Sequence, residues 1–380
     1  MELSLDQAAF ARALRLVGRV VPSRSTNSSA LAILLEAAPG ELRLTATDLE
    51  VTLSTTAPAE TGDTLRLALP GRLLGEYVAQ LPAGRLRLTA GGVKGRVGLE
   101  CERFNAQLAT LDAASFPRPA AFTAEAPLSL DAGRLRGAVE RVAFAAARDT
   151  SRPVLTAVLF SFGAEGLMLT AADGFRLARA AAGGEAGPPR ELLVPAGAVA
   201  ELGHLLGESG AVRLHTEPEG KALRVEVGQT TLVTRLVEGH FPDVERVVPR
   251  EWRTRLTVDL AAFRQAVRVA ALFGEGAEAR PVLLEASDGA VRLHAQGPQV
   301  GETRTELPAS LEGEAQAVVL NTRLLGDILE AARGKDLHIS WLSAQSPVVF
   351  RDGEGEGTAD LWLAMPLHDP SLAHPAAAAA

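Results

Sequence analysis

A threefold internal repeat constrains the fold of this chain more than any other feature of its sequence. The motif LSLD at residues 3–6 returns 125 residues later at 128–131, and again in the form LTVD at 256–259. The same spacing of 125 residues relates Leu69-Pro70 to Val194-Pro195, and Phe116-Pro117 to Phe241-Pro242. Landmarks that recur in one register indicate tandem copies of a single structural unit.

The repeat determines the domain organisation that we expect for the 380-residue chain. We predict three similar domains at residues 1–125, 126–253 and 254–367, each of ordinary size for an independently folding unit. Residues 368–380 end in five alanines, and we expect them to form a disordered tail. The alternative is that this tail lies across a binding surface of the protein.

Each repeat opens with an amphipathic helix and continues with alternating strands. One apolar stripe of the first helix is formed by Phe10, Leu14, Val17 and Val21. Favourable N-caps for the three opening helices are Asp6, Asp131 and Asp259. Segments 41–45 and 84–89 alternate polar and apolar residues, which is typical of antiparallel sheets with one solvated face. The predicted fold class is α+β, with two helices per repeat packed on antiparallel sheets.

Composition and motifs exclude several classes of protein. The single cysteine, Cys101, permits no intrachain disulfide, and we expect it to be a small buried apolar residue. No apolar run approaches the roughly 20 residues of a membrane helix, and the N-terminus lacks a signal-peptide pattern, so we expect a cytoplasmic protein. The sequence contains no phosphate loop, no nucleophile elbow and no paired metal ligands. We therefore predict that the protein is not an enzyme and uses no cofactor or metal.

The formal net charge of −8 argues, taken alone, against a nucleic-acid partner. Arginines nevertheless recur on the polar side of the first helix of each repeat: Arg12, Arg15 and Arg19, then Arg134, Arg141 and Arg148, then Arg264 and Arg268. For any one helix, a solvated face is the simpler interpretation. Recurrence in all three repeats favours a locally positive surface that attracts phosphates. Because few aromatic residues are present to stack on bases, this surface is suited to sequence-independent contact with duplex DNA.

Four motifs point to a known family: LTATDLE at 44–50, TAADGFRLA at 170–178, LVEGHFPD at 236–243 and MPL at 365–367. Through them the chain resembles, over essentially its whole length, the beta subunit of bacterial DNA polymerase III, the beta sliding clamp. The resemblance implies the DNA-clamp fold, with three similar domains forming half of a six-domain ring and a head-to-tail homodimer. It also implies a non-catalytic processivity factor of the replicative polymerase that encircles double-stranded DNA.

The resemblance assigns three sets of site residues. The residues expected to face DNA are Arg12, Arg15, Arg19, Arg24, Arg72, Arg134, Arg141, Arg148, Arg152, Arg264, Arg268 and Arg323. A cleft for partner peptides is expected at Leu155, Gly174, Phe175, Arg176, Leu177, Pro242, Arg246, Val247, Leu363, Met365 and Pro366. The apolar candidates for the dimer interface are Phe104, Leu108, Leu272 and Phe273.

The expected partners of the cleft are the polymerase alpha subunit, the clamp loader, other polymerases and mismatch-repair proteins, each through a short peptide. Two departures from the family pattern stand out: Phe175 replaces a histidine, and the chain continues beyond Met365-Pro366. Asp48 and Asp173, at equivalent repeat positions, suggest a shared turn rather than a catalytic pair. Residues 354–357 (EGEG) suggest a hairpin connection rather than a cation site. The competing hypothesis is a three-repeat protein-binding scaffold with no role on DNA.

Overall fold

The order of helices and strands repeats three times along the chain. The computed structural model describes residues 2–91, 95–117, 127–217, 220–273, 280–297, 301–353 and 360–368. Within these residues each repeat consists of one strand, one helix, four strands, a second helix and three strands. The sequence-based prediction of one unit repeated three times is therefore confirmed at the level of element order.

The bounds of the elements in the first repeat are β1 (Glu2–Asp6), α1 (Gln7–Val17), β2 (Ala32–Ala38), β3 (Gly40–Thr47), β4 (Val51–Glu60), β5 (Leu65–Pro70), α2 (Gly71–Gln80), β6 (Arg85–Ala90), β7 (Arg96–Cys101) and β8 (Phe104–Ala109). Those of the second are β9 (Leu128–Asp131), α3 (Ala132–Val142), β10 (Ala157–Gly163), β11 (Gly166–Ala172), β12 (Arg176–Gly183), β13 (Arg190–Pro195), α4 (Ala196–Leu205), β14 (Ala211–Thr216), β15 (Ala222–Val227) and β16 (Thr230–Arg235). Those of the third are β17 (Thr254–Asp259), α5 (Leu260–Phe273), β18 (Pro281–Ser287), β19 (Ala290–Gly297), β20 (Gly301–Gly313), β21 (Ala317–Asn321), α6 (Thr322–Ala331), β22 (Asp336–Trp341), β23 (Val348–Asp352) and β24 (Leu361–Ala364). Short 3₁₀ helices lie at η1 (Gly18–Val20), η2 (Ser28–Leu31), η3 (Ala143–Ala145), η4 (Pro153–Thr156) and η5 (Val244–Arg246).

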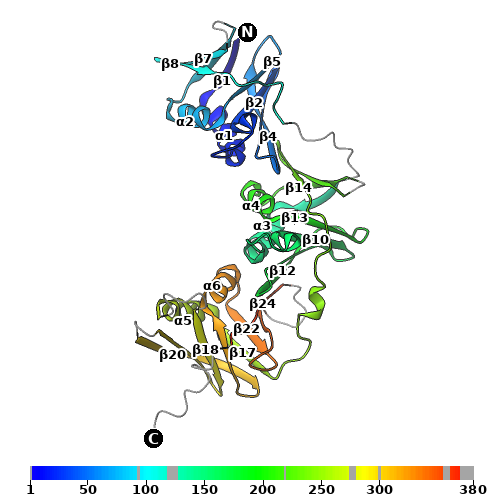
Figure 1. Ribbon diagram of the computed structural model, residues 1–380, viewed down its shortest axis with the longest axis vertical. Coiled ribbons are helices and arrows are strands. Elements are labelled where there is room, and N and C mark those ends of the chain that lie inside the picture. The colour runs from blue at the N-terminus through cyan, green and yellow to red at the C-terminus, as the bar shows by residue number, and fades with distance from the viewer. Residues whose placement is uncertain are drawn as a thin grey trace. The chain divides into compact units, whose positions relative to one another are not determined.

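The chain forms two compact units, Met1–Gly133 with Ala200–Leu236, and Arg134–Val199 with Val237–Ala380. Each unit contains one continuous antiparallel sheet, and the strands of the second repeat are divided between the two. In the first unit the order is β8-β7-β6-β1-β4-β16-β15-β14-β9, with β3, β2 and β5 continuing from β4. In the second unit it is β13-β10-β11-β12-β24-β23-β22-β17-β20-β19-β18-β21 (Figure 1).

Successive repeats are joined by one type of strand pair. Strand β4 of the first repeat pairs with β16 of the second, and β12 of the second pairs with β24 of the third. Val51 lies opposite Thr234 in the first junction, and Arg176, at the repeat position of Val51, lies opposite Ala364 in the second. The sheets therefore run through the repeat boundaries, and the register of the pairing is kept.

Each sheet is covered by helices whose apolar stripes face it. In the first unit α1 contacts β3, β4 and α2, with Phe10 and Leu14 no more than 2% exposed. In the second unit α5 contacts β19, β20 and α6 (Figure 1). Its Phe263 is fully buried. Burial of one such side chain contributes roughly 1.5–3 kcal/mol. As predicted, Asp6 caps α1 by accepting from the N–H of Ala9, and Asp259 caps α5 by accepting from that of Ala262, each at 2.8 Å.

The opening helices are shorter than the apolar periodicity predicted. Helix α1 ends at Val17, and the extended backbone of Val21 places it outside the helix, because Pro22 disfavours helical geometry in the residue before it. Val21 is nevertheless buried. Helix α3 ends at Val142, so Arg148 lies in a loop and not on the helix face.

The predicted role of Asp48 and Asp173 in a shared turn is confirmed. The Oδ1 atom of Asp48 accepts from the backbone N–H groups of Glu50 and Val51, at 2.9 and 2.6 Å. That of Asp173 accepts from those of Phe175 and Arg176, both at 2.9 Å. The turn needs a left-handed residue in second place, which is Gly174 in one repeat and Leu49 in the other.

Three further expectations concern single segments. Cys101 is 1% exposed, as predicted, and burial raises the pKa of its thiol. In the part of the chain that the structure describes, no helix is long and apolar enough to cross a membrane. The loop at 354–357 and the tail from 369 onward lie outside the described residues.

Candidate functional site

The first-repeat arginines that were expected to face DNA lie on α1, in the segment after it, and at the start of α2. Arg12 and Arg15 project from the exposed face of α1, whereas Arg19 in η1 pairs with Glu201 of α4 at 2.7 Å. No ion-pair partner is found, among the described residues, for four exposed arginines of this repeat: Arg12, Arg15, Arg24 and Arg72. Unneutralised cations on and beside α1 are suited to attract phosphate groups.

A loop of the second repeat presents Arg148 and Arg152, and both are exposed. Asp149 orders this loop, because its Oδ1 accepts from the backbone N–H of Ser151 at 3.0 Å and its Oδ2 from the Ser151 hydroxyl at 2.7 Å. The hydroxyl and then the N–H lower the pKa of Asp149 below its usual range. Arg134, at the start of α3, is also exposed and interacts with other groups of the chain.

Two arginines that were expected to face DNA are engaged within the second unit. Arg141 pairs with Asp352 at 3.6 Å and with Asp360, and its side chain is 24% exposed. Arg264 donates to the carbonyl oxygens of Leu329 and Ala332, at 2.6–3.1 Å, and so occupies the unpaired carbonyls at the end of α6. Arg268, one turn further along α5, and Arg323 at the start of α6 are exposed and have no ion-pair partner in the described parts of the chain.

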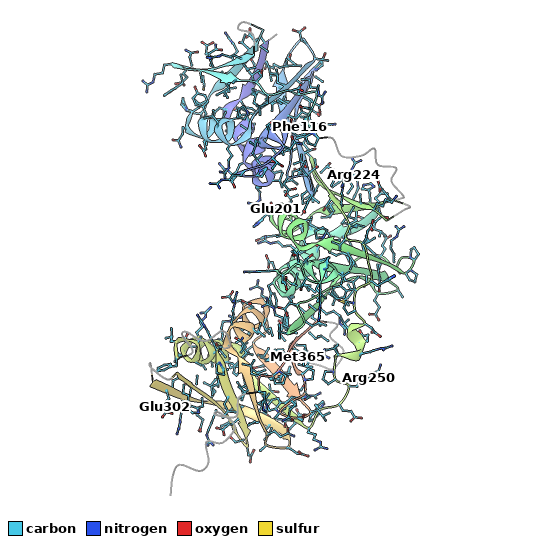
Figure 2. All side chains as sticks on the ribbon, in the orientation of Figure 1. Phe116, Glu201, Arg224, Arg250, Glu302 and Met365 are labelled. Atoms are coloured by element: carbon cyan, nitrogen blue, oxygen red, sulfur yellow. The ribbon has the colours of Figure 1, made fainter. Side chains whose placement is uncertain are left out.

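The residues expected to bind partner peptides gather around the β12–β24 strand pair of the second unit. Leu177 lies directly opposite Leu363. The backbone N–H of Met365, which Figure 2 labels, donates to the carbonyl of Phe175 at 2.8 Å. Leu177 and Leu363 belong to a buried cluster with Val349 and Leu361, against which Ala172, Val244, Val248 and Met365 pack. This apolar floor joins the second and third repeats.

Exposed apolar side chains border this floor. Phe175 is 67% exposed and Val247 is 43% exposed, although both are large and apolar. Arg246 beside Val247 is held by Asp243 at 2.9 Å but keeps most of its side chain in solvent. We call the set formed by Phe175, Val247, Met365 and the floor beneath them the β12–β24 surface.

The remaining cleft candidates are placed as follows. Leu155 is buried in η4 and lies outside the cluster of Leu177, while Pro242 is exposed and Pro366 is half-buried. Gly174 has a φ of +93°, which a residue with a Cβ adopts only with strain. The sequence alone could not separate floor from rim in this set, because both are apolar.

The candidates for the dimer interface lie at β8 and at the end of α5. Phe104 is 38% exposed and Leu272 is 64% exposed, whereas Phe273 is half-buried and Leu108 is only 6% exposed. Leu108 therefore offers little free surface. Leu73 of α2 is 50% exposed and was missed by the sequence analysis, whereas its neighbour Leu74 is fully buried.

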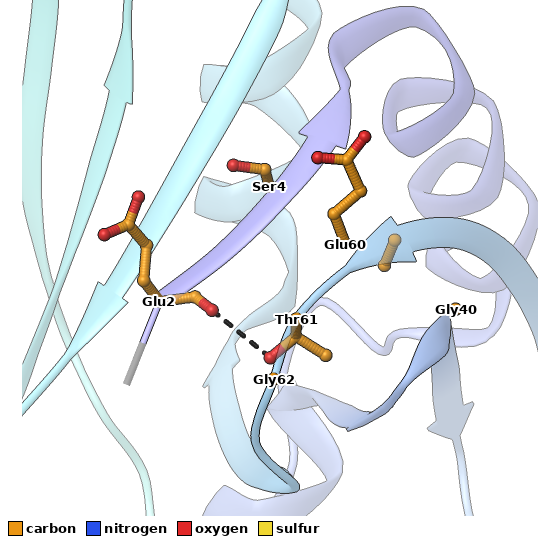
Figure 3. A pocket seen from close by; sticks show the side chains of 7 residues that line it. Glu2, Ser4, Gly40, Glu60, Thr61 and Gly62 are labelled. Carbon is orange, nitrogen blue, oxygen red and sulfur yellow. Dashed lines mark hydrogen bonds between the residues drawn. The ribbon is translucent and has the colours of Figure 1, made fainter.

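The hollow in Figure 3 has none of the features of a catalytic centre. It measures about 520 Å³, is shallow, and is lined by residues of β1 and the end of β4, including Glu2 and Glu60. Arg87 pairs with Glu2 and Arg85 with Glu60, and the Thr61 hydroxyl donates to the Glu2 carbonyl. Among the residues that the structure describes, no group of three or more His, Cys, Asp or Glu side chains is arranged to hold a metal ion.

Comparison with known protein families covers nearly the whole chain. Sequence profiles of the N-terminal, central and C-terminal domains of the DNA polymerase III beta subunit match residues 1–120, 129–243 and 245–366. The chain belongs to the DNA polymerase III beta subunit family. The family that the sequence motifs suggested is therefore confirmed.

Individual members of the family align with the chain over nearly its whole length. The beta sliding clamp of Caulobacter vibrioides is 29% identical over 377 residues, covering 97% of this chain and all of the relative. That of Staphylococcus aureus is 23% identical, covering 96% and 98%. A sliding clamp structure from Bacillus subtilis superimposes with a TM-score of 0.92 at 20% identity, covering 97% and 99%. A Pseudomonas aeruginosa clamp bound to griselimycin gives 0.90 at 25% identity, with the same coverage.

Family membership establishes the coarse function. The chain acts as a sliding clamp in DNA replication, a non-catalytic processivity factor of a family that binds DNA and polymerase. The three-domain clamp fold is confirmed as well, since the clamp structures match it with TM-scores of about 0.9. The hypothesis of a scaffold without a role on DNA finds no support in these relatives.

Proposed function

We propose that two copies of the chain join head to tail into a ring around duplex DNA, with β8 of each copy paired to β20 of the other. The strand pairing between successive repeats carries this proposal. Strand β20 holds the repeat position of β4 and β12, and β8 holds that of β16 and β24. Among the described strands β8 pairs only with β7, and residues 301–308 of β20 pair only with β19. Open edges of this kind are suited to strand addition.

The register of this third junction follows from the first two. Leu111, Val237 and Leu367 make the same backbone hydrogen bond, to the carbonyls of Ala68, Leu193 and Val319. Three residues before each lie Leu108, Thr234 and Ala364, which are therefore equivalent. By their positions in the pairings of β3 with β4, β11 with β12 and β19 with β20, Thr52, Leu177 and Glu302 are likewise equivalent. In the proposed ring, the same register would put Glu302 opposite Gln107 of the second copy, and Arg304 opposite Asn105.

Helix contacts support the same assembly. At the first junction Arg19, just after α1, pairs with Glu201 of α4. The corresponding groups at the third junction are the end of α5, with the exposed Leu272, and α2, with the exposed Leu73. An apolar contact between Leu272 and Leu73 of the other copy would cover both side chains, which is the composition expected of a permanent interface.

The exposed arginines would contact DNA inside such a ring. Of the arginines expected to face DNA, those that are exposed and have no ion-pair partner in the described residues are Arg12, Arg15, Arg24, Arg72, Arg148, Arg152, Arg268 and Arg323. Contacts with phosphates carry no sequence information and weaken with salt, so they permit sliding while the closed ring prevents release. We assign Arg141 and Arg264 to structural roles, because their donors are engaged inside the second unit.

Partner peptides would bind to the β12–β24 surface. An apolar floor with an exposed aromatic rim and a nearby guanidinium is suited to a short peptide with apolar anchors. We propose that the polymerase alpha subunit, the clamp loader, other polymerases and mismatch-repair proteins compete for this surface in the cytoplasm. Griselimycin, which is bound to the Pseudomonas aeruginosa clamp, would serve as a competitor.

Retention on circular DNA tests the proposed ring. Clamp loaded by a clamp loader onto a nicked circular duplex should remain bound through gel filtration in 0.2–0.5 M salt, which is roughly the range that removes electrostatically bound proteins. Cutting the circle with a restriction enzyme should release the clamp, because only topology holds it. Equal retention on circular and linear DNA would contradict the ring.

A further inference from the structure

The β12–β24 surface is linked to helix α6 through Arg176. The Arg176 side chain is only 11% exposed, and its Nε donates to Asp173 Oδ2 at 2.9 Å. Its Nη1 donates to Asp327 of α6, and its Cζ atom lies 5.2 Å from the ring centre of Phe144. These contacts occupy the guanidinium inside the second unit. Arg176 therefore supports the peptide surface from the interior of the unit.

The first repeat has the same turn without the arginine. There Asp48 accepts from Glu50 and Val51, just as Asp173 accepts from Phe175 and Arg176. Valine stands at the position of Arg176, and the turn still forms with Leu49 in a strained left-handed conformation. The turn therefore does not require an arginine, and the link to Asp327 is an addition specific to the second repeat.

We propose that Asp327 is a positioning residue for the partner-peptide surface. Asp327 holds Arg176, and Arg176 in turn holds Asp173. These contacts fix the turn that has Phe175 at its tip, and the backbone carbonyl of Phe175 accepts a hydrogen bond from the N–H of Met365. A fixed turn keeps the exposed Phe175 ring in the orientation that a peptide meets, which lowers the ordering cost of binding. The inference rests on the proposed function of this surface. It also joins the surface to α6, whose first turn carries Arg323.

Peptide affinity in a double-mutant cycle tests this role. The probe is a fluorescent peptide of the C-terminal residues of the replicative polymerase, titrated against the full-length chain. Asp327→Asn should weaken binding about three- to tenfold, within the range of coupled neighbours. Asp327→Glu should retain most of the affinity, since Glu201 serves the equivalent position of α4. Glu330→Gln, an exposed carboxylate on the same helix without an ion-pair partner in the described chain, is the matched control and should bind as wild type.

The cycle separates positioning from general stability. If Asp327 acts through Arg176, then Arg176→Gln combined with Asp327→Asn should bind no more weakly than Arg176→Gln alone. Additive losses, or wild-type affinity in Asp327→Asn, would overturn the proposal.

Amide hydrogen exchange gives a readout that does not depend on peptide. The N–H groups of Phe175 and Arg176, which donate to Asp173, should exchange faster in Asp327→Asn and unchanged in Glu330→Gln. Unchanged exchange in Asp327→Asn would overturn the positioning role even if peptide binds. Failure of the wild-type chain to bind any polymerase peptide, with the exchange effect present, would instead remove the proposed function of the surface.

Discussion

Two kinds of apolar side chain are mixed in the motif proposed to bind partner peptides, and their burial distinguishes them. Leu177 is 3% exposed and packs with Val349, Leu361 and Leu363, so it belongs to the core of the second unit. Phe175, two positions earlier in the chain, is 67% exposed. Their opposite exposure follows from the strand, because Leu177 faces inward from β12 whereas Phe175 lies in the turn before it. The sequence motif assigned both residues to one cleft, because a motif specifies residue types and not how deeply each side chain is buried.

This difference predicts distinct effects of alanine at the two positions. Phe175→Ala should weaken polymerase-peptide binding about tenfold or more, as truncation of an aromatic anchor does, with little change in thermal stability. Leu177→Ala should lower the free energy of unfolding by about 2–5 kcal/mol, because it opens a cavity in a packed cluster. Chemical denaturation and fluorescence anisotropy would measure the two quantities. A stable Leu177→Ala chain, or unchanged affinity in Phe175→Ala, would contradict the assignment of floor and rim.

At the scale of helices and strands, the sequence predicted the starts and apolar faces of the helices better than their ends. The aspartate caps and the apolar stripes of α1 and α5 were predictable, because capping and 3.6-residue periodicity are local. The ends of α1 and α3 were overestimated, because the apolar periodicity continues up to Pro22 and past the 3₁₀ turn that follows α3. Likewise, no local pattern reveals that Arg264 binds carbonyls 65 and 68 residues away.

Arg264 and Arg268, one turn apart on α5, therefore form a matched pair for experiment. Arg264→Ala should lower the free energy of unfolding by about 1.5–3 kcal/mol, because it leaves carbonyls at the end of α6 without a charged donor. Arg268→Ala should leave stability unchanged and reduce the salt dependence of DNA binding by about one phosphate contact. Urea denaturation and DNA binding at several salt concentrations would distinguish them. The reverse outcome would return Arg264 to the DNA-facing set.

At the scale of the whole molecule, the proposed ring rests on the junctions between repeats. Three repeats offer three junctions, and the chain forms two of them, β4 with β16 and β12 with β24. The number and order of domains could be read from the landmarks spaced by 125 residues, but the pairing strands could not. Strand pairing between repeats depends on the backbone edges of the strands, which leave no sequence motif. It therefore became visible only in the strand pairs of the structure.

A single proline tests the third junction. Cys101 and Phe104 flank a two-residue hairpin loop, so alternation along β8 directs the N–H of Gln107 away from β7 and toward the open edge. Gln107→Pro removes that N–H while leaving the β7–β8 ladder intact, as proline at an edge strand does. We expect Gln107→Pro to be a folded monomer by light scattering and circular dichroism, and to be lost from nicked circles. Gln107→Ala, which keeps the N–H, should remain a dimer. A Gln107→Pro chain that dimerises like wild type would show that β8 does not pair with β20 in the register derived from the other two junctions.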